Sequence, residues 1–239
     1  MIKLIAKQLR IHQWTKNFLI FLPVFLAHVD FDLELVKILI LGFIAFSFTA
    51  SSVYILNDIF DLESDKKHPE KKKRPIASGL IDLNIAYSIL LFLLVSGLLL
   101  SFSINIKLFF ILLFYLLSNF AYTLYFKNFV ILDIIFLTLF YTIRVISGHI
   151  IGLNEFPSSP WLISFIIFFF FSLGAVKRYS DILLMLKNQS SSSMERGYQL
   201  HDRTLIMAIG ISSGLISALI VVLYTSSEIV SKMYKNPIF

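Results

Sequence analysis

The sequence predicts an all-α, polytopic membrane helix bundle, and three observations support this fold class. Hydrophobic residues make up 57% of the 239 residues, charged residues make up 15%, and 25 residues are phenylalanine. The mean hydropathy of +0.82 is higher than a soluble domain of this length normally has. The apolar residues also gather in stretches of about 20, the length that a helix needs to cross a hydrocarbon core.

Seven apolar stretches are long enough to be considered as membrane spans. The first is short and contains Pro23, and no small-residue cleavage site follows it, so we expect a retained span rather than a signal peptide. One integral-membrane domain over residues 1–239 is expected, because a segment in lipid must satisfy its own backbone hydrogen bonds. The expected spans are residues 15–29, 35–56, 83–104, 108–126, 129–153, 160–176 and 204–225.

The positions of the basic residues predict the orientation of these spans. Most of the 21 Lys and Arg residues precede the first span or follow the second, fourth and sixth spans. The positive-inside rule then places the N-terminus and the long connections 57–82 and 177–203 in the cytoplasm of an inner or plasma membrane. The exceptions, on the other face, are Lys37, Lys107, Lys232 and Lys235.

The same counts exclude some functional classes. The net charge of +6 is explained by topology, and no nucleic-acid-binding motif accompanies it. Because the chain has no cysteine, disulfides and Cys-ligated metals are excluded.

Acidic residues gather where the second span ends. At 100° per residue, Asp58, Asp61 and Asp65 fall within about 60° of one helix face, and Asn57 widens this arc to about 100°. Carboxylates crowded in this way repel one another unless a cation lies between them, and Mg²⁺ prefers oxygen ligands that it shares with substrate phosphates. The alternative is a solvated helix end whose acids pair with neighbouring lysines.

A basic run follows this acidic motif directly. It comprises His68, the lysines 71–73 and Arg74, and it precedes Pro75. Lys and Arg can hold the charge that remains on a cation-bound diphosphate. The alternative is that the run only sets the topology and binds anionic lipid headgroups.

Two charged residues lie within the fifth expected span. Asp133 and Arg144 are eleven residues apart, which places them on the same side of the helix but about 16 Å apart along its axis. Buried charges usually face a polar cavity, although Asp133 could instead pair with Lys127 at the interface. Lys177 and Asp181 emerge from the sixth span at helical i,i+4 spacing and could simply pair with each other.

Several motifs in order resemble one known group. The stretch NDIFDLESD at residues 57–65 has the N-D-x-x-D-x-x-x-D form of the UbiA prenyltransferase superfamily. Further stretches resemble its decaprenyl-phosphate phosphoribosyltransferase branch, and together the motifs run over nearly the whole chain. These are QWTKN at 13–17, HPEKKKRPIASG at 68–79, YTLYFKNFVILD at 122–133, RVISG at 144–148 and KRYSD at 177–181.

The resemblance implies a Mg²⁺-dependent transfer of 5-phosphoribose from its 1-diphosphate (PRPP) to a polyprenyl phosphate, with release of diphosphate. Asp58, Asp61 and Asp65 would bind the metal, with Asn57 beside them as a fourth catalytic residue. Aromatic prenyltransferases of the superfamily carry a second D-x-x-x-D cluster where this chain has Lys177, Arg178 and Asp181. One carboxylate cluster with cations opposite it favours the phosphoribosyl branch. The implied substrate-binding residues are Lys16, Lys73, Arg74, Tyr122, Lys127, Asp133, Arg144, Lys177, Arg178 and Asp181.

Two other functions remain open at this point. One is prenyl transfer to an aromatic acceptor on the same fold, and the other is a lipid transporter or scaffold without catalysis. Because most charges lie at one membrane face, a transport path with charges spaced across the membrane is disfavoured. The superfamily usually has nine spans and seven are expected here, so either the sequence is truncated or the last two helices are absent.

Overall fold

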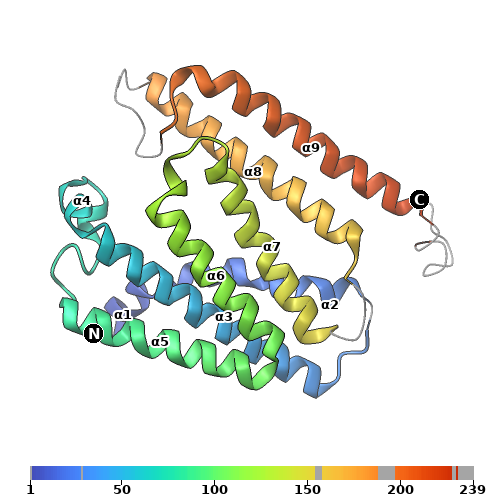
Figure 1. Cartoon of the computed structure of the whole chain (residues 1–239), viewed down its shortest axis with the longest axis horizontal. Helices are drawn as coiled ribbons and strands as arrows, with labels where there is room; N and C mark the ends of the chain where they lie inside the picture. The colour runs from blue at the N-terminus through green and yellow to red at the C-terminus, as the bar shows by residue number, and fades with distance from the viewer. Residues whose placement is uncertain (1, 28, 154–157, 188–196, 228–229, 231–239) are drawn as a thin grey trace. The chain divides into compact units, whose positions relative to one another are not determined.

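The computed structural model describes residues 2–27, 29–153, 158–187, 197–227 and 230 (Figure 1). Six of its helices are long and apolar enough to cross a membrane, so the chain is a multi-pass integral membrane protein with an all-α bundle fold. These helices are α3 (Leu33–Phe60), α5 (Leu83–Ile104), α6 (Ile106–Leu124), α7 (Leu132–Gly152), α8 (Pro160–Lys187) and α9 (Arg203–Thr225). Each corresponds to one of the expected spans.

The expected span at residues 15–29 is wrong as a single helix. A short helix α1 (Ile2–Gln8) is followed by a 3-10 helix η1 (Ile11–Ile20) and then by α2 (Leu22–Leu26), which has Pro23 in its first turn. Proline cannot donate the backbone hydrogen bond that a continuous helix needs, and it fits best in a first helical turn. The apolar composition was recognised correctly, but the break before Pro23 makes the regular segments too short to span.

The chain divides into two compact units. The first contains Met1–Thr123 and Ile143–Phe156, and the second contains Leu124–Thr142 and Pro157–Phe239. The chain passes from one unit to the other at the last residue of α6, within α7, and between residues 156 and 157.

In the first unit α3 and α5 run side by side (Figure 1). Gly97 of α5 permits this close approach, because a Cβ there would lie 2.7 Å from Thr49 Oγ1 and 3.0 Å from the carbonyl oxygen of Ala45. Near the start of α5 the helices bury an apolar cluster that includes Ile55, Ile76 and Ile81. The cluster anchors the connection between the two helices, which carries the basic run.

The 3-10 helix η1 is attached to α3 by polar side chains. Trp14 Nε1 donates to Ser51 Oγ (3.0 Å), and Asn17 Nδ2 donates to Ser47 Oγ (2.9 Å). Asn17 Oδ1 in turn accepts a hydrogen bond from Nε of the buried Arg144 (2.8 Å). These bonds satisfy polar groups that would otherwise be costly within the membrane.

In the second unit α8 and α9 pack through small residues. A Cβ at Gly210 of α9 would lie 3.0 Å from the Cβ of Ala175, and Ser172 Oγ donates to the carbonyl oxygen of Gly210 (2.8 Å). Small residues let membrane helices approach closely. A Cβ at Gly174, on α8, would similarly come within 2.9 Å of Ile134 Cγ2 in α7.

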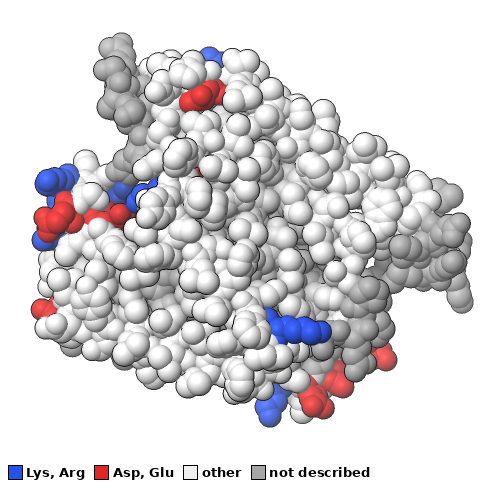
Figure 2. Space-filling model, viewed as in Figure 1, with Lys and Arg blue, Asp and Glu red and all other residues white. Residues whose placement is uncertain are grey.

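Charged side chains occupy only a few places on the face shown in Figure 2. One group of both signs lies over the short helix α4 (Leu62–Lys67) and its surroundings. Large apolar side chains are exposed along the long helices, among them Phe92, Leu99 and Phe114. Exposed apolar surface on membrane-spanning helices is the surface that contacts lipid.

Candidate active site

The acidic motif forms at the junction of α3 and α4. The backbone N–H of Asp61 donates to the carbonyl oxygen of Asn57 (2.9 Å). The backbone N–H of Asp65 donates to the backbone carbonyl oxygen of Asp61 (2.8 Å). These two bonds bridge the junction, although Asp61 itself has a ψ of 7° and separates the two helices. Arg74 Nη1 contacts both Asp58 and Asp65 across it. Both side chains are buried, with 3% and 1% of their surface exposed.

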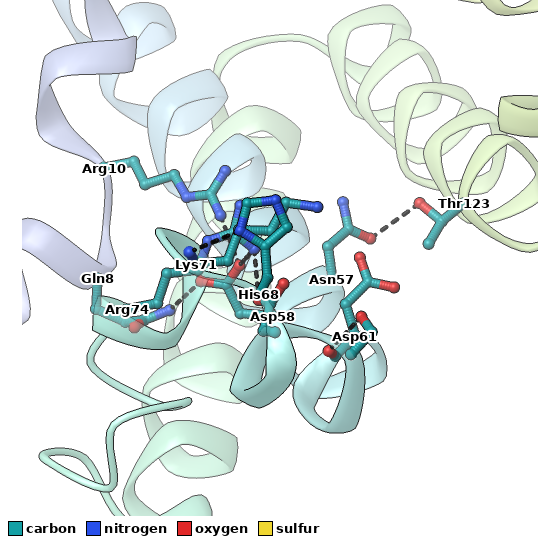
Figure 3. A network of polar contacts seen from close by, with 11 residues as sticks. Gln8, Arg10, Asn57, Asp58, Asp61, His68, Lys71, Arg74 and Thr123 are labelled. Atoms are coloured by element: carbon teal, nitrogen blue, oxygen red, sulfur yellow. Dashed lines mark hydrogen bonds and ion pairs between the residues drawn. The ribbon is translucent and has the colours of Figure 1, made fainter. Parts of the chain in front are cut away.

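Asp58 accepts hydrogen bonds from three side chains. Its Oδ1 lies 2.5 Å from Arg10 Nη2 and 3.0 Å from Arg74 Nη1, and its Oδ2 lies 2.9 Å from Gln8 Nε2. Figure 3 shows Gln8, Arg10 and Arg74 gathered around this carboxylate. Two guanidinium groups compensate the buried negative charge, as a buried carboxylate requires.

Arg74 also binds the second buried carboxylate. The same Nη1 atom that contacts Asp58 lies 2.6 Å from Asp65 Oδ2. The short 3-10 helix η2 (Lys71–Lys73) delivers Arg74 to this position, and Pro75 and Ile76 are buried directly after it. Lys7 Nζ donates to the carbonyl oxygen of Lys73 (3.2 Å), which fixes the loop against the end of α1.

Arg10 reaches Asp58 from an unusual backbone conformation. Its φ of 51° and ψ of 48° are left-handed, which disfavours a residue with a Cβ by about 1–2 kcal/mol. Its guanidinium group also lies 5.0 Å from the ring centroid of Tyr54, in α3. The contacts with Asp58 and Tyr54 offset the backbone strain, a pattern that is typical of functional sites.

Asn57 and Asp61 lie on the other side of the motif. Asn57 Oδ1 accepts a hydrogen bond from Thr123 Oγ1 (2.9 Å), and Figure 3 shows Asp61 on this same side, away from Arg10 and Arg74. Within the described part of the chain, no three His, Cys, Asp or Glu side chains are grouped so that they could hold one metal ion. The sequence pattern correctly brought Asp58 and Asp65 together, but one ion shared by all three carboxylates stays a prediction.

Two buried oxygen atoms beside these carboxylates fit a hard divalent cation. Asp65 Oδ1 and Gln8 Oε1 accept no hydrogen bond, although both residues are 1% exposed. A buried acceptor without a donor costs free energy, which a bound cation or its water ligands would recover. Oxygen atoms of carboxylate and amide groups are the ligands that Mg²⁺ prefers, so the donor set suits this ion.

His68 and Lys73 of the basic run have structural partners. His68 Nδ1 accepts hydrogen bonds from the backbone N–H groups of Glu70 (3.1 Å) and Lys71 (3.2 Å). The side chain of Lys73 forms an ion pair with the exposed carboxylate of Glu70 (3.1 Å). Lys66 pairs with the exposed Glu63 (2.8 Å). The charged partners described for Asp58 and Asp65 are arginines. These contacts therefore do not support the alternative in which lysines neutralise the acidic motif.

A second polar cluster lies in the second unit. Arg178 donates to both carboxylate oxygens of Asp133, from Nε and from Nη2 (3.2 Å), and its Nη1 donates to Asp181 Oδ2 (2.9 Å). The Tyr198 hydroxyl donates to Asp133 Oδ2 (3.4 Å). Arg178 and Asp133 are 2% and 0% exposed, so this guanidinium group stabilises the unit, and its contact with a substrate phosphate stays a prediction.

Tyr198 is held in its neutral form by this cluster. Burial and, to a smaller extent, the negative charge of Asp133 raise the pKa of Tyr198 to about 12. Gly197 precedes it with a φ of +71°, and a Cβ there would lie 2.1 Å from the carbonyl oxygen of Asn128. Glycine is therefore required for the chain to place Tyr198 at Asp133.

The remaining predicted residues occupy different environments. The guanidinium group of Arg144 lies 5.0 Å and 5.6 Å from the ring centroids of Phe46 and Tyr115 in the first unit. Lys16 and Tyr122 are half-buried in the same unit. In the second unit Lys127 is half-buried and Lys177 is exposed.

Spacing arguments missed some residues of the site. Gln8 is 50 positions from Asp58, and Arg10 is 48 positions from it, so helical periodicity could not link them. Arg10 had only the features of an ordinary membrane-interface cation. Tyr198 carried no signal at all in the sequence.

Comparison with known proteins decides the family. The profile of the UbiA prenyltransferase family matches residues 18–226. The chain belongs to this family. Membership agrees with the all-α bundle fold, which the solved structures confirm.

Two of the similar solved structures come from archaea. A UbiA homolog from Archaeoglobus fulgidus bound to GPP and Mg²⁺ has a TM-score of 0.66 at 19% identity, over 97% of this chain and 88% of that one. The apo UbiA homolog from Aeropyrum pernix K1 has a TM-score of 0.65 at 16% identity, over 87% of this chain and 76% of that one. At these identities the similarity establishes the fold alone.

Curated UbiA relatives are more similar in sequence. The uncharacterized protein y4nM of Sinorhizobium fredii is 34% identical over 96% of this chain and 44% of its own length. The nodulation protein NoeC of Azorhizobium caulinodans is 29% identical over 93% of this chain and 72% of its own length. A decaprenyl-phosphate phosphoribosyltransferase of Mycobacterium tuberculosis is 31% identical over 75% and 60%. The chain thus spans less than two thirds of the length of two of these relatives.

Proposed function

We propose that this UbiA-family protein transfers 5-phosphoribose from PRPP to a polyprenyl phosphate at the cytoplasmic membrane face and releases diphosphate. The observation that carries the proposal is the buried pair Asp58 and Asp65, which two arginines contact and in which Asp65 Oδ1, like Gln8 Oε1 beside Asp58, has no donor. Such a site suits a metal-bound diphosphate. The similarity to decaprenyl-phosphate phosphoribosyltransferases over 75% of the chain supports phosphoribose as the transferred group.

The second acidic position supports the same choice. Arg178 contacts both Asp133 and Asp181, and among the described residues no buried oxygen of this cluster lacks a donor, unlike Asp65 Oδ1. One carboxylate pair matches one metal-bound diphosphate, that of the donor. An acceptor that is itself a phosphate needs cations and no second metal-binding carboxylate pair.

The residues of the site have distinct roles in the proposed reaction. The bond between C1 of ribose and the diphosphate oxygen breaks, and an oxygen of the polyprenyl phosphate bonds to C1. Mg²⁺, when bound, supplies neutralisation of the charge that develops on the departing diphosphate. Asp58 and Asp65 would hold it, while Arg10 and Arg74 donate to phosphate oxygens and hold the donor in line. Because the acceptor oxygen is already anionic, no general base is required.

A paired-substrate assay tests the proposal. Purified protein is given labelled PRPP and a polyprenyl phosphate, with and without Mg²⁺, and the lipid fraction is analysed for phosphoribosylated product. Metal-dependent product that disappears in Asp58→Asn is expected. If the protein instead makes product only from a prenyl diphosphate and an aromatic acid, the phosphoribosyl assignment is wrong.

Prenyl transfer remains the second candidate because of specific similarities. A structurally similar UbiA homolog binds GPP and Mg²⁺, and a digeranylgeranylglyceryl phosphate synthase of Methanocaldococcus jannaschii is 39% identical over 34% of this chain. The same Asp58–Asp65 site would then bind the diphosphate of an isoprenoid. A non-catalytic lipid transporter would give binding or flux without metal dependence and no product from either pair of substrates.

A further inference from the structure

Arg74 stands at the point where a cation would bridge the two buried carboxylates. Its Nη1 atom lies 3.0 Å from Asp58 Oδ1 and 2.6 Å from Asp65 Oδ2, so one nitrogen carries both contacts. Asp58 and Asp65 would hold a divalent ion through carboxylate oxygens, and Arg74 already contacts one oxygen of each. Arg74 and the ion therefore compete for the same two oxygen atoms.

We propose that Arg74 is an exchangeable counterion that leaves Asp58 and Asp65 for the diphosphate when a divalent ion arrives. The inference rests on the proposed function and adds a coupling between its two ligands. A divalent ion alone must displace Arg74 and leaves the guanidinium group without an anion. A diphosphate that arrives with the ion supplies that anion for Arg74. Each ligand therefore binds the protein weakly by itself, and the ion and the diphosphate bind it strongly when both are present.

The local structure permits this exchange. The side chain of Arg74 is 30% exposed, and its backbone is extended with a ψ of 144°, so the guanidinium group can turn without unwinding a helix. Arg10 and Gln8 still hold Asp58 after Arg74 has moved. Asp65 Oδ1 and Gln8 Oε1 are free of donors, so ligand oxygens are present before the exchange begins.

The strength of the contact sets the expected size of the coupling. Hydrogen bonds between charged groups are strong enough that displacing Arg74 weakens ion binding by roughly tenfold to hundredfold. Removal of the guanidinium group should therefore strengthen binding of the ion alone. The same change should weaken binding of the ion–diphosphate complex, because Arg74 then has no contact to offer.

The test measures binding, independently of turnover. Mn²⁺ replaces Mg²⁺, and the purified protein is titrated with Mn²⁺ alone by electron paramagnetic resonance and with preformed manganese diphosphate by calorimetry. For Arg74→Gln we expect at least tenfold tighter Mn²⁺ binding and at least tenfold weaker manganese diphosphate binding than in the wild type. Arg74→Lys keeps the positive charge but lacks the planar guanidinium group. Both of its affinities should therefore lie between those of the wild type and those of Arg74→Gln.

Lys66→Gln is the matched control. It removes a cation one residue after Asp65 that pairs with the exposed Glu63, and both affinities should stay at wild-type values. Unchanged Mn²⁺ binding in Arg74→Gln and Arg74→Lys, with weaker manganese diphosphate binding, overturns the exchange and leaves the proposed function intact. Loss of both affinities in both variants also overturns it, since Arg74 would then only support the fold. A wild-type protein that binds no manganese diphosphate overturns the proposed function as well.

Discussion

At the scale of single residues, the site depends on how Asp58 and Asp65 are neutralised. Both carboxylates are almost completely buried, and arginines from two separate segments reach them. A buried charge without such partners would shift towards its neutral form. The arginines therefore compensate the charge of both buried carboxylates.

Asp58→Asn tests the role of this charge. The substitution keeps the shape of the side chain but removes the negative charge, so it should lower turnover by about 10²-fold or more through the lost electrostatic stabilisation. The measurement is the rate of labelled lipid product per amount of folded protein. Glu63→Gln, an exposed acid in the same segment, should stay close to wild type. Equal losses in both variants would contradict a specific role for Asp58.

Tyr198 predicts a dependence of stability on alkaline pH. Its pKa is raised from 10.0 to about 12, so between these values the folded protein retains a proton that the unfolded chain loses. The free energy of unfolding then decreases as pH rises through this window, by up to about 2.7 kcal/mol for two pH units. Below pH 10 the contribution is fully present.

Thermal unfolding of wild type and Tyr198→Phe at pH 9 and pH 11 measures this effect. The phenylalanine variant lacks the titrating hydroxyl, so its melting temperature should fall less between the two values. Parallel decreases in the two proteins would show that Tyr198 does not contribute in this way.

At the scale of elements, η1 is held against α3 at three successive levels. Arg10 contacts Asp58, Trp14 contacts Ser51, and Asn17 contacts Ser47. Seven residues of 3-10 helix rise about 14 Å, and the eleven residues from position 47 to 58 of an α-helix rise about 16 Å, so the antiparallel pairing fits. The register of η1 therefore determines where Arg10 meets Asp58.

Gly148→Ala should disturb this register. A Cβ at Gly148 would lie 1.8 Å from the carbonyl oxygen of Ile20, at the last residue of η1, and neither backbone can yield easily. We expect a loss of stability of about 3 kcal/mol or more, at the upper end of what overpacking a buried contact costs. Gly210→Ala, whose Cβ meets Ala175 at 3.0 Å, should cost clearly less in thermal unfolding. The reverse order would contradict the tight contact at Ile20.

Asn17→Ala should also weaken the first unit. The change leaves the Nε group of buried Arg144 and the hydroxyl of Ser47 without this partner, at a cost of about 1–3 kcal/mol for an unsatisfied buried group. Chemical unfolding in detergent measures it, with the exposed Thr15→Ala as the control. If Asn17→Ala and Thr15→Ala have the same free energy of unfolding, Asn17 is not a positioning residue.

At the scale of the whole molecule, the distribution of Lys and Arg predicts the orientation in the membrane. The chain contains no cysteine, so single-cysteine variants can be labelled without background. Lys107→Cys should react with an impermeant maleimide in intact cells, whereas Lys67→Cys should react only after the membrane is opened. The opposite labelling pattern would place the proposed site on the other face.

The sequence by itself determined the six long helices and the grouping of Asp58 with Asp65. Both follow from local periodicity: about 20 apolar residues cross the membrane, and positions seven apart return to the same side of a helix. It failed at residues 15–29, where Pro23 interrupts the helix. Only the tertiary structure decided which cations meet the acids, because Arg10 and Gln8 are about fifty residues from Asp58 and Tyr198 is 65 from Asp133. Pairings across such distances depend on how buried charges are compensated when helices pack, and no local pattern in the chain encodes them.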